Sequence, residues 1–87
     1  MPAGATLDKI ATEYPIILID GGGHNALCNT IALRKAGLLK DNGEKKMDVR
    51  GGDILTLGET GKPTGYITDE VIPYVVNKAV GALLDDA

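Results

Sequence analysis

The sequence predicts a small α+β domain with a short, mainly antiparallel sheet and two helices, formed by residues 1–87 as a single domain. Three observations support this class. One short run is apolar and rich in β-branched residues, two later segments alternate polar and apolar residues, and two stretches carry the composition and end signals of helices. A minimal α/β arrangement is the alternative.

The sequence predicts a strand at Ile16–Asp20. Residues Thr6–Glu13 before it form a short, weakly amphipathic piece. Pro15 ends any helix there, because the residue before a proline is pushed toward extended conformations. The run that follows is continuously apolar up to its last residue, which is typical of a strand buried on both faces.

The next element is expected to be a helix at Ala26–Ala36. Asn25 precedes it as a candidate N-cap, and Gly37 stands where a left-handed C-terminal residue is favoured. Beyond it, Asn42-Gly43 predicts a tight turn. Met47–Arg50, Asp53–Leu57 and Gly65–Ile67 then read as short extended pieces of a small antiparallel sheet region.

The last segment predicts a second helix with a well-marked start. Thr68 is a candidate N-cap, Ile67 and Ile72 are spaced as a hydrophobic staple, and Pro73 falls within the first turn or restarts the helix. The apolar residues between Ile72 and Leu84 cover more than half of the helix circumference. Part of that arc is therefore expected to contact another chain. The predicted interface residues are Val76, Val80, Gly81 and Leu83.

Composition also favours association with other proteins. The 87 residues include no Phe and no Trp, so the core must be built from aliphatic side chains, and small chains gain little net stability from such a core. The single Cys28 excludes an internal disulfide, and one His with one Cys offers no metal-ligand cluster, so no metal or cofactor is expected. We therefore expect a homo-oligomer or a place in a larger protein assembly.

Charge and hydropathy argue against other partners. The net charge is −3, and the short basic run near Lys45 is interleaved with acidic residues, so nucleic acid is not an expected partner. No stretch has the ~18 consecutive apolar residues of a membrane span, and no secretion signal is seen at the N-terminus. A soluble protein of the cytoplasm or of a virion is expected.

The segment Gly21, Gly22, Gly23, His24, Asn25 is the candidate ligand-binding site. Glycines between a strand and a helix N-terminus let backbone N–H groups approach a phosphate. The match to the dinucleotide fingerprint is poor, however, because the acidic residue expected about twenty positions on falls in the Asn-Gly turn. A plain turn is the favoured interpretation. The later loop "GETGKPTG" does not have the spacing of a Walker A loop.

His24 and Cys28 are the remaining chemical candidates. Their spacing of four residues would bring them into contact on a helix, and a thiolate beside a histidine is the minimum of a cysteine nucleophile. A buried, inert cysteine is nevertheless the commoner outcome for a thiol on an apolar stripe. No catalytic residue is predicted.

These observations predict a non-catalytic structural or accessory subunit of a larger protein assembly, for example a virion decoration or capsid-cementing protein. The alternative belongs to another class. It is a small phosphate- or nucleotide-binding module, or a small enzyme subunit, that uses the Gly21–Asn25 loop.

Overall fold

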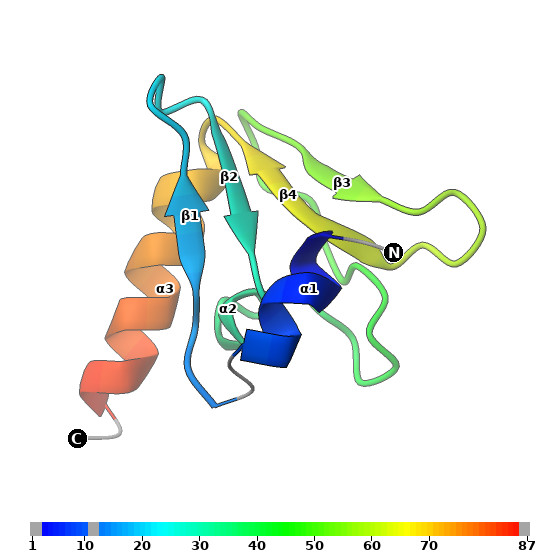
Figure 1. Cartoon of the computed structure of the whole chain (residues 1–87), viewed down its shortest axis with the longest axis horizontal. Helices are drawn as coiled ribbons and strands as arrows, with labels where there is room; N and C mark the ends of the chain where they lie inside the picture. Colours follow the sequence, from blue (N-terminus) through cyan, green and yellow to red (C-terminus); the bar gives the residue numbers. More distant parts are fainter. Residues whose placement is uncertain (1–2, 11–12, 86–87) are drawn as a thin grey trace.

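A four-stranded antiparallel sheet forms the centre of the molecule, and the α+β class is confirmed (Figure 1). The computed structural model describes residues 3–10 and 13–85. The strand order is β1-β2-β4-β3. The elements are α1 (Ala3–Ile10), β1 (Ile17–Ile19), β2 (Asn25–Cys28), α2 (Thr30–Lys35), β3 (Ile54–Thr56), β4 (Pro63–Thr68) and α3 (Val71–Asp85).

Two hairpins make up this sheet. In the first, the Asp20 N–H donates to the Asn25 carbonyl at 2.9 Å, which continues the β1–β2 ladder beyond β1. In the second, the Leu57 N–H donates to the Lys62 carbonyl at 2.8 Å at the turn between β3 and β4. The hairpins join through β2 and β4, where Ala26 lies opposite Ile67.

The core lies on one face of the sheet, between the sheet and helices α2 and α3. Alternate strand residues face it, because successive side chains of a strand point to opposite faces. We call this the inner face. Ile67 of β4 is fully buried there, together with Val71 and Val75 of α3. The other buried residues of this cluster are Ala26, Cys28, Ala32, Leu33, Ala36, Leu38, Ile54 and Ile72.

The first strand differs from the sequence-based prediction. β1 is an edge strand: among the described strands it has a neighbour on only one side, and Leu18 and Ile19 are 54% and 51% exposed. It is not buried on both faces. A continuous apolar run identifies a strand, but it does not show whether other elements cover both of its faces.

The predicted helix at Ala26–Ala36 was wrong in its first turn. Its start is strand β2, and the helix is the shorter α2. The cap is Asn29, not Asn25: the Asn29 Oδ1 accepts from the Ala32 N–H at 2.9 Å. The same oxygen accepts from the Ile16 N–H at 3.0 Å, and the Asn29 Nδ2 donates to the Tyr14 carbonyl at 2.7 Å. Pairing of β2 with both β1 and β4 outweighs the local helix propensity of this segment.

Other boundaries also move. The described residues contain three helices, because the piece near Thr6–Glu13 forms α1 as an eight-residue helix. Met47–Arg50 is not a strand. Strand β3 lies within the predicted piece Asp53–Leu57, and β4 extends beyond both ends of the predicted piece Gly65–Ile67. The tight turn is confirmed, with Gly43 at a φ of 91°. A bridge between Leu39 and Lys45 closes it.

Helix α3 starts three residues later than its predicted cap. Thr68 ends β4, and Asp69 turns the chain at a φ of 49°, a left-handed conformation that Asp tolerates better than most residues. Pro73 then falls in the first turn of α3. It does not break the helix there, since the first N–H groups of a helix have no intrahelical partner.

Gly52 is required by the corner between β4 and α3. A Cβ atom built at this position would lie 2.2 Å from the Thr68 carbonyl oxygen and 2.9 Å from Cγ2 of Val71. The first of these is a backbone atom, so no side-chain rotation relieves the overlap. The glycine therefore allows the loop before β3 to pack directly on the corner that leads into α3.

We predict that Gly52→Ala destabilises the fold by about 3 kcal/mol, as overpacking against a fixed neighbour does. The control is Gly21→Ala, since nothing lies within 4 Å of a Cβ at Gly21 and no positive φ is found there. Its effect should stay within about 0.5 kcal/mol. Urea denaturation followed by circular dichroism measures both. Equal midpoints for the two variants would contradict the close approach.

Candidate functional site

The face of the sheet opposite the core, the outer face, carries an exposed line of apolar side chains. Leu18, Leu27 and Tyr66 lie opposite one another across β1, β2 and β4, and Leu55 of β3 lines the same hollow. We call these four residues the apolar row. Leu18, Leu55 and Tyr66 are each about half exposed. The open groove they line has a volume of about 500 Å³.

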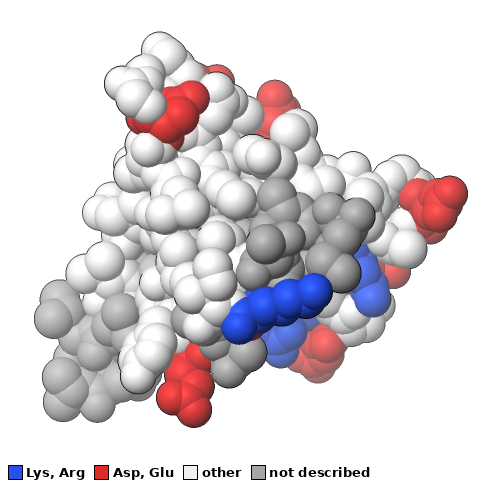
Figure 2. Space-filling model, viewed as in Figure 1, with Lys and Arg blue, Asp and Glu red and all other residues white. Residues whose placement is uncertain are grey.

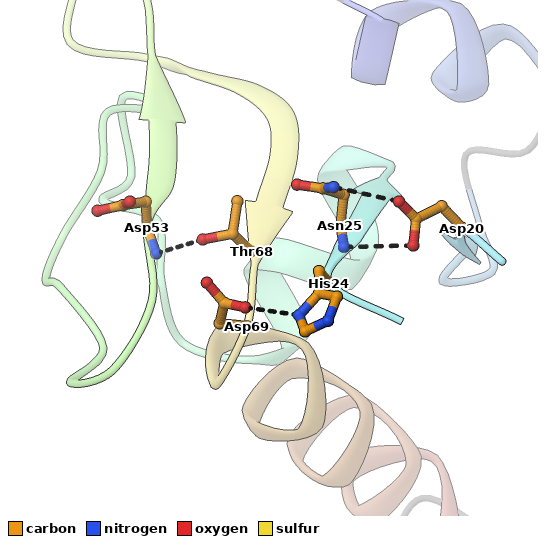
Figure 3. A network of polar contacts seen from close by, with 6 residues as sticks. All are labelled: Asp20, His24, Asn25, Asp53, Thr68 and Asp69. Atoms are coloured by element: carbon orange, nitrogen blue, oxygen red, sulfur yellow. Dashed lines mark hydrogen bonds and ion pairs between the residues drawn. The ribbon is translucent and has the colours of Figure 1, made fainter. Parts of the chain in front are cut away.

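A second line of side chains crosses the outer face, and each of its residues is two positions away in the sequence from a residue of the apolar row. Asp20 lies opposite Asn25, which pairs with Thr68, and Thr68 in turn exchanges backbone and side-chain hydrogen bonds with Asp53 (Figure 3). We call these four residues the polar row. Because two residues of a strand span about 7 Å, the polar row borders the apolar row at that distance. Asp20 and Asn25 also line the groove.

The Asp20 carboxylate is held in its charged form. The Asn25 side chain donates to Oδ2 of Asp20 at 3.1 Å, and this bond, helped by backbone N–H groups of the turn, lowers the pKa of Asp20 below its ordinary value. A carboxyl group whose pKa is lowered in the folded protein stabilises the fold at pH values above its unfolded-state pKa. This contribution is lost as the pH falls through the folded-state pKa. At neutral pH the row therefore presents fixed negative charge.

His24 stands next to the polar row and is held by Asp69. Its Nδ1 lies 3.2 Å from Oδ1 of Asp69, and its carbonyl accepts from the Asp69 N–H at 2.9 Å. A carboxylate only accepts hydrogen bonds, so the proton of this contact is on Nδ1. Nε2 has no partner among the described residues, and the His24 side chain is 80% exposed. Figure 3 shows the imidazole turned toward Asp69 at the end of β4.

The sequence-predicted ligand segment does not have the geometry that suggested phosphate. Gly21, Gly22 and Gly23 form the turn of the β1–β2 hairpin, and Asn25 is the first residue of β2. The helix N-terminus is at Thr30, beyond the other end of β2. The three glycines therefore do not lead directly into a helix.

His24 and Cys28 are also separated. They precede and end a strand, so their Cα atoms are about 13 Å apart rather than one helical turn apart. Cys28 is fully buried, and burial raises the pKa of its thiol to about 12. The expected burial of Cys28 is confirmed. Cys28 and His24 do not have the geometry of a Cys–His nucleophile.

We predict that Cys28 reacts with a thiol reagent at pH 7–8 only through opening of the fold. The thiolate is the nucleophile, and it is scarce both because the pKa is raised and because the side chain is covered. Labelling with Ellman's reagent should therefore be slower than in urea by about two orders of magnitude or more. Labelling of the native protein at the rate of the unfolded chain would contradict this.

The predicted interface on α3 is only partly exposed. Val80 is 47% exposed, Val76 packs against the core cluster, and a Cβ at Gly81 would meet nothing within 4 Å. Leu83 lies in α3, but its side chain is outside the described part of the structure. The wide apolar arc is largely explained by the sheet and α2, which cover Ile72, Val75 and Ala79.

Sequence reasoning missed both rows of the outer face. They appear only when residues from four strands align, and Asn25–Cys28 was assigned to a helix. The available signal was the alternation of polar and apolar residues in the strands, read together with the hairpin turns.

The broad surface over β1 and β2 carries few charged side chains, and the charges lie toward its ends. Figure 2 shows an extended area without charged side chains over β1 and β2, and acidic side chains at the tip of the β1–β2 turn. Lys and Arg gather on the opposite, lower side of this view. Within residues 3–10 and 13–85, no three metal-ligating side chains cluster, and no helix has the length and hydropathy needed to cross a bilayer.

Comparison with known proteins finds one similar stretch. Protein LONG AFTER FAR-RED 3 of Arabidopsis thaliana is 33% identical over 75 residues, which make up 86% of this chain. The chain spans about 12% of the length of that relative. No protein-family model matches the chain, and no solved structure matches it.

Proposed function

We propose that this chain is a non-catalytic structural or accessory module of a larger protein assembly, and that it docks through the outer face of its sheet. The observation that carries the proposal is the apolar row, with Leu18, Leu55 and Tyr66 between 45% and 54% exposed on one groove. Contiguous exposed apolar surface of this kind marks interaction sites on folded proteins. A virion decoration or capsid-cementing protein is one assembly of this class.

The chemistry of the face supports one kind of partner within this proposal. The apolar row accepts apolar side chains, and the polar row adds the carboxylates of Asp20 and Asp53 about 7 Å away. A complementary surface is a protein segment with an apolar ridge flanked by Lys or Arg at that spacing. The relative supports a modular role, because the similar stretch is about 12% of its length and so is one part of a larger protein.

A photo-crosslinking experiment tests this function. With p-benzoylphenylalanine in place of Tyr66, irradiation in a lysate of the native source should yield an adduct with a partner protein. The cross-linked peptide should carry Lys or Arg beside apolar residues. Leu55→Glu should reduce the adduct about tenfold or more, since it sets a charge in the groove. Asp53→Asn should lower the yield of the adduct and make that yield less sensitive to salt concentration.

The matched control is Met47→Glu. Met47 is 42% exposed but lies in neither row, so this variant should leave the adduct unchanged. No adduct with another protein, or one insensitive to Leu55→Glu, would contradict docking through the outer face.

A second candidate function is favoured by His24. A histidine oriented by a carboxylate, with Nε2 open, is the arrangement of a proton-transferring or ligand-binding group. The contact between His24 and Asp69 therefore supports the alternative, a ligand-binding module or small enzyme subunit that uses Gly21–Asn25. The carboxylates of Asp20 and Asp69 beside the turn disfavour phosphate, so a neutral or cationic ligand fits this version better.

If Gly21–Asn25 is only a hairpin turn, inorganic phosphate, adenine nucleotides and small amines at millimolar concentration should not raise the melting temperature. His24→Ala should then lower the stability by less than about 1 kcal/mol, because the contact with Asp69 is exposed. Thermal-shift measurements check both. A ligand-dependent rise that disappears in His24→Ala and persists in the control Met47→Glu would favour the second function instead.

A further inference from the structure

The free edge of β1 presents unpaired backbone groups. In the strand order β1-β2-β4-β3, β2 is the neighbour of β1 among the described strands. The Asp20 N–H bonds to the Asn25 carbonyl, and the Asn29 N–H bonds to the Ile16 carbonyl. Because bonded and non-bonded pairs alternate in an antiparallel ladder, the even-numbered residues of β1 face β2. The N–H and C=O groups of Ile17 and Ile19 therefore point away from the sheet.

Strand β1 is short, with three residues, but it has no charge, bulge or proline along this edge. β1 contains no charged residue, and its side chains are exposed on both faces of the sheet, Leu18 on the outer face and Ile19 on the inner face. Natural edge strands are commonly protected by charges, bulges or prolines. The opposite edge, β3, has such a feature, since its register with β4 shifts between Ile54 and Thr56.

We infer that a second copy of this chain pairs with β1 along this edge, antiparallel and about a two-fold axis at Leu18. This goes beyond the docking function, because it concerns a different surface. In this register Ile17 of one copy lies opposite Ile19 of the other, and the outward N–H and C=O groups of these residues bond to each other. Two hairpin sheets become one continuous sheet.

The flanking residues favour this register. With the axis at Leu18, the two Asp20 residues are separated by four strand positions, or about 13 Å. Moving the axis to Ile19 would bring them to about 7 Å, where like charges repel. Pro15 has no N–H to donate and so adds no donor beyond Ile17. The pairing is thus confined to the apolar part of the strand.

The same pairing covers apolar surface on both faces. Leu18 of the two copies would meet on the outer face, so that the two apolar rows become continuous. On the inner face, Ile19 of one copy would contact Ile17 of the other. Helix α3 runs along the same side of the molecule as β1 (Figure 1).

Amide hydrogen exchange at Ile17 and Ile19 tests the dimer directly. Their N–H groups should exchange freely at tens of micromolar protein and be protected about tenfold or more near 1 mM, while the Leu18 amide stays protected throughout. Over the same range the molar mass from light scattering should rise toward twice that of one chain. Free exchange at both amides and a constant single-chain mass would overturn the proposal.

Two variants separate pairing from folding. Ile17→Pro removes an outward N–H without removing a bond to β2, and Ile19→Lys places a charge at the pairing edge. Each should keep the circular dichroism spectrum of the fold and abolish the mass increase. The control Leu55→Glu, which should lose the partner on the outer face, should still dimerise. A dimer that persists in both edge variants would overturn the β1 register even if docking through the groove holds.

Discussion

The buried side chain of Asn29 ties three parts of the chain together. Its Oδ1 accepts from the backbone N–H groups of Ile16 and Ala32, and its Nδ2 donates to the Tyr14 carbonyl. These bonds fix the segment before β1, the end of β2 and the start of α2 relative to one another. An aliphatic residue of the same size would leave three backbone groups short of a partner in an interior where each costs about 1–3 kcal/mol. The position of β1, and so of the outer face, depends on this amide.

The outer face combines an apolar row with a polar border. Apolar side chains are usually buried, but the apolar row is exposed. Polar side chains are usually exposed, but here they border apolar ones. Side by side they divide one surface into an apolar strip and a charged border, with Asp20 kept ionised by Asn25. In the proposed docking, the apolar strip would supply the area that drives association, and the charged border would set orientation and partner choice. The proposed docking would remove Tyr66 and Leu18, both about half exposed, from water.

The sequence was sufficient for the fold class and for several local features. The α+β class, the Asn42-Gly43 turn and the burial of Cys28 all follow from composition and short-range pattern. What it could not show depends on long-range pairing. Asn25 and Asn29 are equally good caps by residue type, and only the ladder of β2 with β4 decides that the helix begins after Asn29. The exposure of β1 likewise depends on strand order. The apolar and polar rows bring together residues up to 48 positions apart, from Asp20 to Thr68.

The division of the sheet into two hairpins affects how the chain reaches its native state. The two strands of each hairpin are joined by a short connection. The pairing of Leu27 with Tyr66 instead joins residues that lie far apart in the sequence. Contacts of that sequence separation form slowly, because a long loop must be ordered first. Each half also contributes one of the two central strands, and α2 from the first half packs against α3 from the second. A cut within the turn at Asn42 would thus give two fragments, and the central strand of each pairs with the central strand of the other.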